Sequence, residues 1–110
     1  MEHRIITKED KETLEMCKYM AQAYRKRREE LGLTKEEVAE RINKPVSTVT
    51  KSENSFSIGL HEMLSIGRDV YGLDVYDLLK EAEAYAKEAV NQAEAVEKAE
   101  GAAKDEGAEK

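Results

Sequence analysis

Apolar and small residues recur between positions 8 and 31 at alternating steps of three and four. The stripe consists of Leu14, Cys17, Ala21, Tyr24, Arg28 and Leu31. This spacing puts the stripe on one face of a long N-terminal helix, with Arg28 as its one charged member. Gly32 predicts the end of that helix, because glycine readily adopts the left-handed conformation that closes many helices.

A second, short helix is predicted over residues 35–41. Thr34-Lys35-Glu36-Glu37 is a capping box, in which the Thr34 hydroxyl accepts the Glu37 amide and the glutamate reaches back. Its inner face would carry Val38, Ala39 and Ile42. Asn43 follows, a residue that tolerates positive φ, so a tight turn is expected there.

Three more helices are expected before residue 80. The first runs from Pro45 to Glu53, with Val49 as its main buried residue, since proline is tolerated in the first turn of a helix. Residues 54–59 read as a polar connection, and residues 60–71 as a fourth helix. A fifth helix is expected to start at Asp74, which would cap it.

Beyond Lys80 the chain is composed mostly of Ala, Glu and Lys. These residues favour helix over residues 80–99, while Gly101 and Gly107 indicate a frayed or disordered end. Runs of β-branched residues typical of strands are missing, so the fold class is all-α. We expect a folded domain over residues 8–79 and an acidic Ala/Glu-rich helical tail over residues 80–110.

Charge is unevenly distributed along the chain. The net charge is −6, but residues 81–110 carry nine acids and four lysines, which gives −5. Residues 25–58 carry eight bases and six acids, which gives +2. The middle of the chain is therefore mildly basic, and an acidic total does not exclude a nucleic-acid partner.

Catalytic and metal chemistry are not expected. One cysteine and two histidines cannot supply four zinc ligands, and we expect neither a metal nor a cofactor. Cys17 is expected to be a buried, unreactive thiol, and His61 to be exposed on the fourth helix. His3 lies in a terminus expected to be mobile. The chain also lacks an apolar run of signal or membrane length, so the cytoplasm is the default location.

The functional motif is the pair of short helices around Asn43. Two helices joined by a turn of three or four residues present the second helix to the DNA major groove. Such a pair needs a small residue at the helix crossing, a permissive residue in the turn and a branched anchor on the second helix. Ala39, Asn43 and Val49 meet these needs.

The chain resembles the Cro/C1-type (XRE) helix-turn-helix family. The resembling stretches are residues 25–43, residues 47–54 and the closing segment Gly72-Leu-Asp-Val-Tyr-Asp-Leu-Leu79. The resemblance implies a five-helix, lambda-repressor-like domain that binds duplex DNA, as in a transcriptional regulator. It also implies a homodimer, because such motifs read paired half-sites one helical turn apart.

The resemblance assigns DNA contacts to particular residues. The positions implied are Lys35, Val46, Ser47, Thr50, Lys51 and Asn54. Ser and Thr can bond several base edges, Lys can donate to guanine, and Val46 can contact a thymine methyl. Amides at the start of the Lys35 helix can hold a phosphate, and Asn54 lies in the implied phosphate-contacting loop.

An ion pair between Arg28 and Glu53 is implied in the same way. A buried charge without a partner is costly, and the chain provides both members. Arg25, Lys26 and Arg27 can add electrostatic attraction to DNA. Lys44, Ser52 and Ser55 depart from the family pattern, since they replace two apolar residues and a glycine.

A protein-interaction module is the alternative reading. Domains similar to this one occur in antitoxins and in bridging factors that dock other proteins. The tail offers a weak apolar seam for a partner or a dimer. Its positions are Leu78, Ala82, Tyr85, Ala89, Ala93 and Val96.

Overall fold

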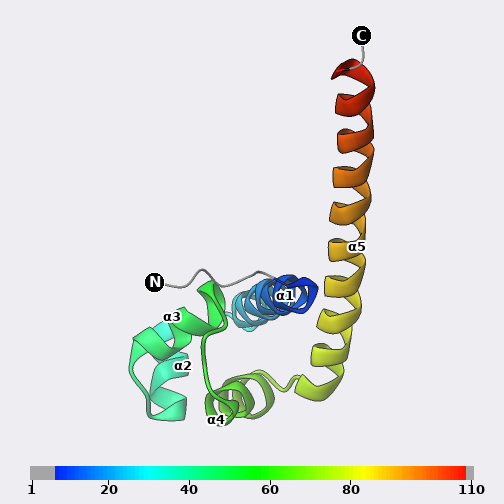
Figure 1. Cartoon of the computed structure of the whole chain (residues 1–110). Coiled ribbons are helices and arrows are strands. Elements are labelled where there is room, and N and C mark those ends of the chain that lie inside the picture. The colour runs from blue at the N-terminus through cyan, green and yellow to red at the C-terminus, as the bar shows by residue number, and fades with distance from the viewer. Residues whose placement is uncertain (1–6, 109–110) are drawn as a thin grey trace, which may run out of the picture.

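The computed structural model describes residues 7–108, and their side chains as far as residue 96. It contains the α-helices α1 (Lys8–Glu30), α2 (Lys35–Ile42), α3 (Val46–Asn54), α4 (Leu60–Leu64) and α5 (Val75–Ala108), with a π-helix, η1 (Ser65–Val70), between α4 and α5 (Figure 1). No strand occurs among the described residues. The predicted all-α fold is therefore confirmed.

Local hydrogen bonds set the helix ends where the sequence places them. The Thr34 hydroxyl accepts the Glu37 amide at 3.1 Å, and the Glu37 carboxylate accepts the Thr34 amide at 3.1 Å. Asn43 is left-handed at φ 54° and Gly32 at φ 69°. The Asp77 amide donates to the Asp74 carboxylate at the start of α5, at 3.1 Å. The predicted capping box, both turns and the α5 cap are confirmed.

The core forms where α1 packs against α3 and α5 and where α2 joins them. Its buried members are Met20, Tyr24, Val38, Ala39, Val49, Ile66, Tyr71, Val75 and Ala82. The predicted α1 stripe is wrong at its ends, because Leu14 is 57% exposed and Leu31 is 41% exposed. Met20, which the stripe left out, is buried, since both α5 and α3 pack against α1.

The connection over residues 54–59 is not a plain polar loop. Phe56 has a positive φ of 54° and packs its ring edge-on against Tyr24, with centroids 4.9 Å apart. Ile58 also packs against the core. The prediction of a polar connection is wrong at these two residues, because the loop crosses over the buried Tyr24 ring and covers it.

The predicted fourth helix is split into α4 and η1. At this junction the Tyr24 hydroxyl donates to the Met63 carbonyl at 2.7 Å. Gly67 allows the approach, because a Cβ there would overlap the Tyr24 hydroxyl and come within 2.8 Å of a Val75 methyl. The widened turn therefore depends on a glycine facing a tyrosine.

We expect Gly67→Ala to destabilise the domain by about 1–3 kcal/mol, because the added methyl must displace a buried ring. Urea unfolding followed by circular dichroism measures the change. Wild-type stability for this variant would show that the tyrosine can move aside without cost.

Alkaline pH offers a second test of the core. Burial raises the pKa of both Tyr24 and Tyr71, and the Tyr71 hydroxyl lacks a hydrogen-bond partner among the described residues. The unfolded chain releases these protons near pH 10 and the folded chain keeps them, so stability is full below pH 10 and falls above it. We expect a slope of about 1.4 kcal/mol per pH unit for each tyrosine.

Urea unfolding between pH 9 and pH 11 measures this slope. Tyr71→Phe is the matched variant, because it removes one titrating hydroxyl that has no hydrogen-bond partner among the described residues. This variant should reduce the pH dependence of the free energy of unfolding by the contribution of one tyrosine. Its free energy of unfolding at pH 7 should be unchanged or higher, because no hydrogen bond is lost. Identical slopes for the wild type and Tyr71→Phe would show that the pKa of Tyr71 is not raised by folding.

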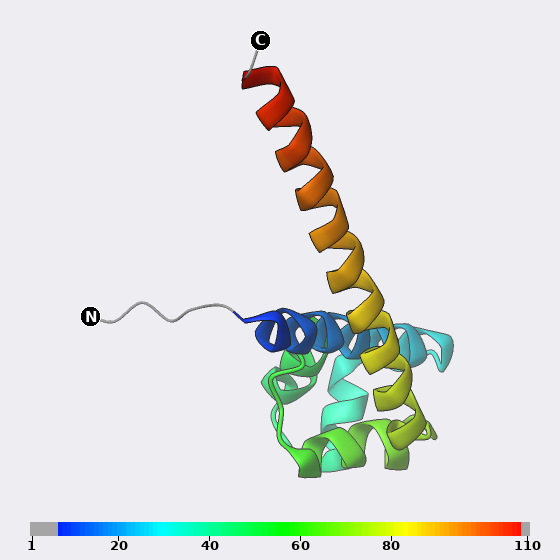
Figure 2. The same cartoon turned by 45° about the vertical axis from the view of Figure 1, so that its right-hand side comes forward.

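Helix α5 runs without a break through the boundary expected at residues 79 and 80. Ala82, Ala86 and Val90 are buried, and the Tyr19 ring of α1 lies 5.2 Å from the Tyr85 ring. In two views α5 crosses α1 and then projects beyond it (Figures 1 and 2). The division into a domain over residues 8–79 and a tail over residues 80–110 remains a prediction.

No helix in the described part of the chain is long and apolar enough to span a membrane.

Candidate nucleic-acid interface

Helices α2 and α3 pack through small and branched side chains. Val38 and Val49 are fully buried and Ala39 is nearly so. The turn between the two helices holds Asn43, Lys44 and Pro45, and Pro45 forms the N-cap of α3 with an extended backbone. This arrangement matches the helix pair predicted from the spacing of Ala39, Asn43 and Val49, and it fixes α3 from one side.

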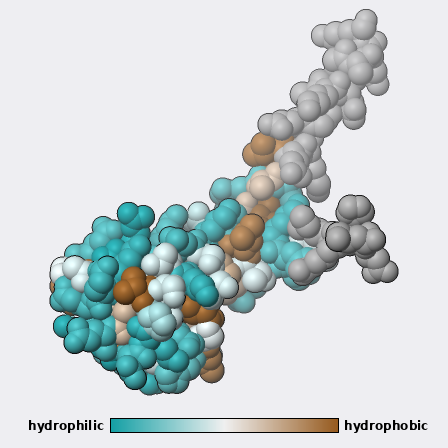
Figure 3. Space-filling model, turned by 90° about the vertical axis from the view of Figure 1, so that its left-hand side faces the viewer, coloured by the Kyte–Doolittle hydropathy of each residue, from teal (hydrophilic) through white to brown (hydrophobic). Residues whose placement is uncertain are grey.

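The opposite side of α3 faces away from the core. Ser47, Lys51 and Asn54 are exposed, Val46 is 36% exposed, and Thr50 is half-buried. Lys35, at the first turn of α2, is half-buried. The side of the molecule on which α2 and α3 lie is mostly hydrophilic, with small hydrophobic patches (Figure 3). The structure thus brings five of the six predicted DNA contacts together on α3.

A buried ion pair fixes the position of α3. The Arg28 guanidinium donates to both Glu53 oxygens, at 2.7 Å from Nε and 3.1 Å from Nη2, and also to the Leu33 carbonyl at 2.9 Å. The two charged side chains are only 14% and 2% exposed. The hydrogen bond with Glu53 raises the pKa of Arg28, so the guanidinium stays charged. It joins α1, α3 and the turn before α2.

The neighbouring basic run is largely paired within its own molecule. Arg25 Nε lies 2.9 Å from the Glu29 carboxylate, and Arg27 donates to the Tyr71 carbonyl at 2.9 Å. Lys26 is exposed, with no ion pair among the described residues. Since internal partners already occupy Arg25 and Arg27, we expect the run to add less to DNA binding than its charge indicates.

Two of the departures from the family pattern acquire partners in the structure. Lys44 Nζ lies 3.6 Å from the Glu62 carboxylate, which ties the turn to α4 by an ion pair. The pKa of Glu62 is lowered by a hydrogen bond from its own backbone amide and, secondarily, by Lys44. Ser52 is fully buried, and its hydroxyl donates to the Val49 carbonyl at 2.6 Å. A buried hydroxyl satisfied in this way carries little penalty.

The other candidates for chemistry do not gather into a site. Cys17 is half-buried, so its expected full burial is wrong. His61 is exposed on α4, as predicted, and His3 lies outside the described residues. No group of acids, histidines and cysteines among the described residues could hold a metal ion.

The geometry defines a class of protein: an all-α domain that presents the second helix of a helix-turn-helix. Residues 25–65 match the family model for helix-turn-helix domains. The chain therefore carries a DNA-binding helix-turn-helix domain of the Cro/C1 (XRE) type. No curated protein and no solved structure matched the chain in the two other comparisons.

Phe56 and Gly67 are the residues around the site that sequence reasoning missed. Both lie against Tyr24, and neither takes part in the helical spacing that identifies a core face. For Phe56, the sequence contained one indication of burial, namely a phenylalanine standing alone in a polar loop. For Gly67, no local sequence pattern indicates that it faces the Tyr24 ring.

Breaking the buried pair should be costly. We expect Arg28→Ala or Glu53→Ala to destabilise the domain by about 3–5 kcal/mol, since each leaves a buried charge without its partner. The matched control is Glu29→Ala, which breaks the exposed pair with Arg25 and should cost under about 1 kcal/mol. Urea unfolding ranks the three variants. Equal costs for the buried and exposed pairs would show that the pair does not hold α3.

Proposed function

We propose that this protein is a sequence-specific transcriptional regulator that inserts α3 into the major groove of duplex DNA. The observation that carries the proposal is the outward face of α3. Ser47 and Lys51 lie one helical turn apart, both are exposed, and the buried ion pair holds the helix on its other side. Side chains in this arrangement can reach base edges without any change of fold.

Each outward residue supports a distinct contact. Lys51 has no ion pair among the described residues, so its ammonium is available to guanine O6 and N7. Ser47 can donate to or accept from several bases. Val46, at the first turn of α3, offers an apolar surface to a thymine methyl. The amides at the start of α2, next to Lys35, suit a phosphate, which the helix dipole favours.

The salt dependence of binding tests the electrostatic part of the proposal. Lysines bound to phosphates release counterions, so log K should fall linearly with log salt concentration. Asn54 and Lys35 are the residues proposed to contact phosphates, together with the α2 amides. Transcription control, homodimeric binding and a cytoplasmic location belong to the same proposal.

The decisive variants are Ser47→Ala and Lys51→Ala. We expect each to weaken binding to selected DNA by about 5–150-fold, corresponding to about 1–3 kcal/mol per lost base contact. Genomic fragments selected by the wild-type protein supply the DNA, and fluorescence anisotropy measures the affinity. Lys87→Ala is the control, because Lys87 is exposed on α5 and paired with Glu83. Circular dichroism checks that all variants keep the fold.

Unchanged binding in both α3 variants would remove the proposal. If a protein partner were instead lost on deletion of residues 97–110, which lie beyond Val90, the last buried residue in the described part of α5, the adaptor or antitoxin-like reading would be favoured.

A further inference from the structure

The corner between the start of α1 and the middle of α5 holds an open cavity of about 140 Å³. All of its lining residues belong to these two helices. The apolar part of the lining consists of Leu14 on α1 and of Ala89, Val90 and Ala93 on α5. Leu14 is 57% exposed, although it is large and apolar. An apolar surface at this corner therefore stays in contact with water after the described part of the chain has folded.

The chain enters α1 beside this cavity. Thr7 is the N-cap of α1 in a complete capping box, in which its hydroxyl accepts the Asp10 amide and its amide donates to the Asp10 carboxylate, both at 3.1 Å. A hydrophobic residue just before the N-cap often packs beside the fourth residue of the helix, which fixes the angle of entry. That fourth residue is Lys11, which lines the cavity. Packing of this kind would bring the residue before Thr7 to the edge of the cavity.

We propose that Ile5 and Ile6, which precede Thr7 and lie outside the described residues, dock over the cavity between α1 and α5. Two apolar residues in succession suit an apolar corner better than they suit water. Lys11 offers Ile6 little apolar surface on α1 itself, whereas the cavity wall on α5 is apolar.

The segment is long enough to reach the cavity. Lys11 lies four residues after Thr7, which corresponds to about 6 Å along the helix axis. The two residues before Thr7 span about 7 Å when the chain is extended. A turn back along α1 therefore brings both isoleucines to the level at which the cavity begins.

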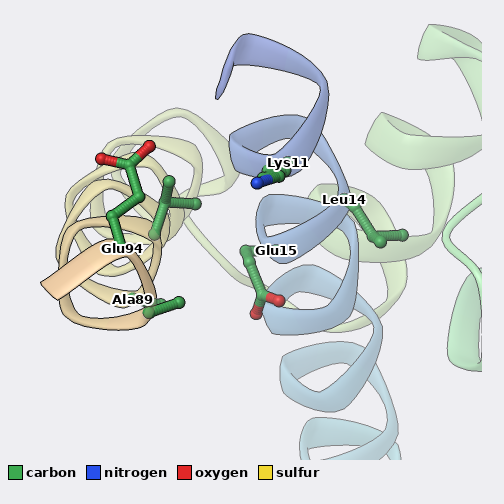
Figure 4. Close-up of a pocket in the computed structure, with 7 residues that line it drawn as sticks. Lys11, Leu14, Glu15, Ala89 and Glu94 are labelled. Carbon is green, nitrogen blue, oxygen red and sulfur yellow. The ribbon is translucent and has the colours of Figure 1, made fainter. Parts of the chain in front are cut away.

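The charges at the rim of the cavity suit the residue before this apolar pair. Glu15 on α1 and Glu94 on α5 contribute two carboxylates, and Lys11 contributes one ammonium (Figure 4). Glu15 already pairs with a lysine of its own helix at 3.3 Å. Glu94 is half-buried and forms no ion pair with any side chain that the structure describes. Docking of Ile5 brings the Arg4 guanidinium within reach of these acids, and such a pair orients the segment more than it strengthens the docking.

Docking would give α5 additional support where it leaves the domain. Val90 is the last buried residue in the described part of α5, and the helix continues to Ala108. Beyond the crossing with α1, α5 projects without support from another element in both views (Figures 1 and 2). A segment bound against Val90 and Ala93 would extend the packed part of α5 by about one turn. The N-terminal segment would thus stabilise the direction in which α5 projects, whether or not the domain is bound to DNA.

Methyl NMR of the full chain tests the docking directly. We expect nuclear Overhauser effects from the δ1 methyls of Ile5 and Ile6 to the methyls of Leu14 and Val90, with intensities that do not change on tenfold dilution. A mixture of differently labelled copies should give none of these effects between molecules. Effects between molecules would show that a second copy occupies the cavity and would overturn the proposal. The absence of any effect from either isoleucine would overturn it as well.

A matched pair of variants on α5 tests the site. Ala93 lines the cavity, whereas Ala95 does not and lies about 160° away around the helix. Both alanines are exposed, so a lysine at either position adds the same charge and keeps the helix. Ala93→Lys should weaken the effects from Ile5 and Ile6 at least tenfold, because it puts an ammonium into the apolar corner next to Arg4. Ala95→Lys should match the wild type, and equal results for the two variants would overturn the proposal.

Disulfide cross-linking provides a test that does not depend on methyl assignments. In a Cys17→Ser background, Ile6→Cys combined with Ala93→Cys should form a disulfide within one molecule under mild oxidation. Ile6→Cys combined with Ala95→Cys should not, because position 95 faces away from the cavity. Mass spectrometry under non-reducing conditions separates disulfides within a molecule from those between molecules. Equal cross-linking of the two pairs would show that the segment has no fixed site and would overturn the proposal.

Discussion

The buried pair between Arg28 and Glu53 is the constraint on which the arrangement of this domain depends. It links the end of α1 to the end of α3 and also satisfies the Leu33 carbonyl in the turn before α2. A charge pair that is almost fully removed from water requires well-aligned hydrogen bonds, because otherwise the desolvation cost of the two charges is not offset. Its directionality fixes the rotation of α3 more tightly than the nearby apolar contact of Val49 can. The outward face of α3 is a consequence of that rotation.

Tyr24 connects this arrangement to the far side of the core. Its ring contacts Phe56 and Tyr71 edge-on, and its hydroxyl bonds to the Met63 carbonyl. The loop after α3, the junction of α4 with η1 and the end of η1 thus all contact one buried side chain. Small residues make this possible, because Gly67 faces the ring directly. The same use of small residues recurs at Ala82 and Ala86, where α5 packs on α1.

Local signals in the sequence predicted the helix ends well. The capping box at Thr34 and the left-handed Asn43 depend on neighbouring residues alone, and the structure has both. The core was harder to predict at Leu14 and Phe56. Whether an apolar residue is buried depends on which element covers it, and the path of α5 across α1 is a long-range property. For the site, the family resemblance pointed to Ser47 and Lys51, and both are exposed on α3. Nothing in the sequence indicated that Lys44 would pair with Glu62.

The central claim is that the outward face of α3 is the surface that meets duplex DNA. Chemical-shift mapping tests it most directly, because it reports contact residue by residue: ¹⁵N-labelled protein is titrated at low salt with a short duplex. The account predicts that the largest shifts fall on the amides of Val46, Ser47, Lys51 and Asn54 and on the start of α2 at Lys35. Shifts confined to α5, or none at all, would contradict it.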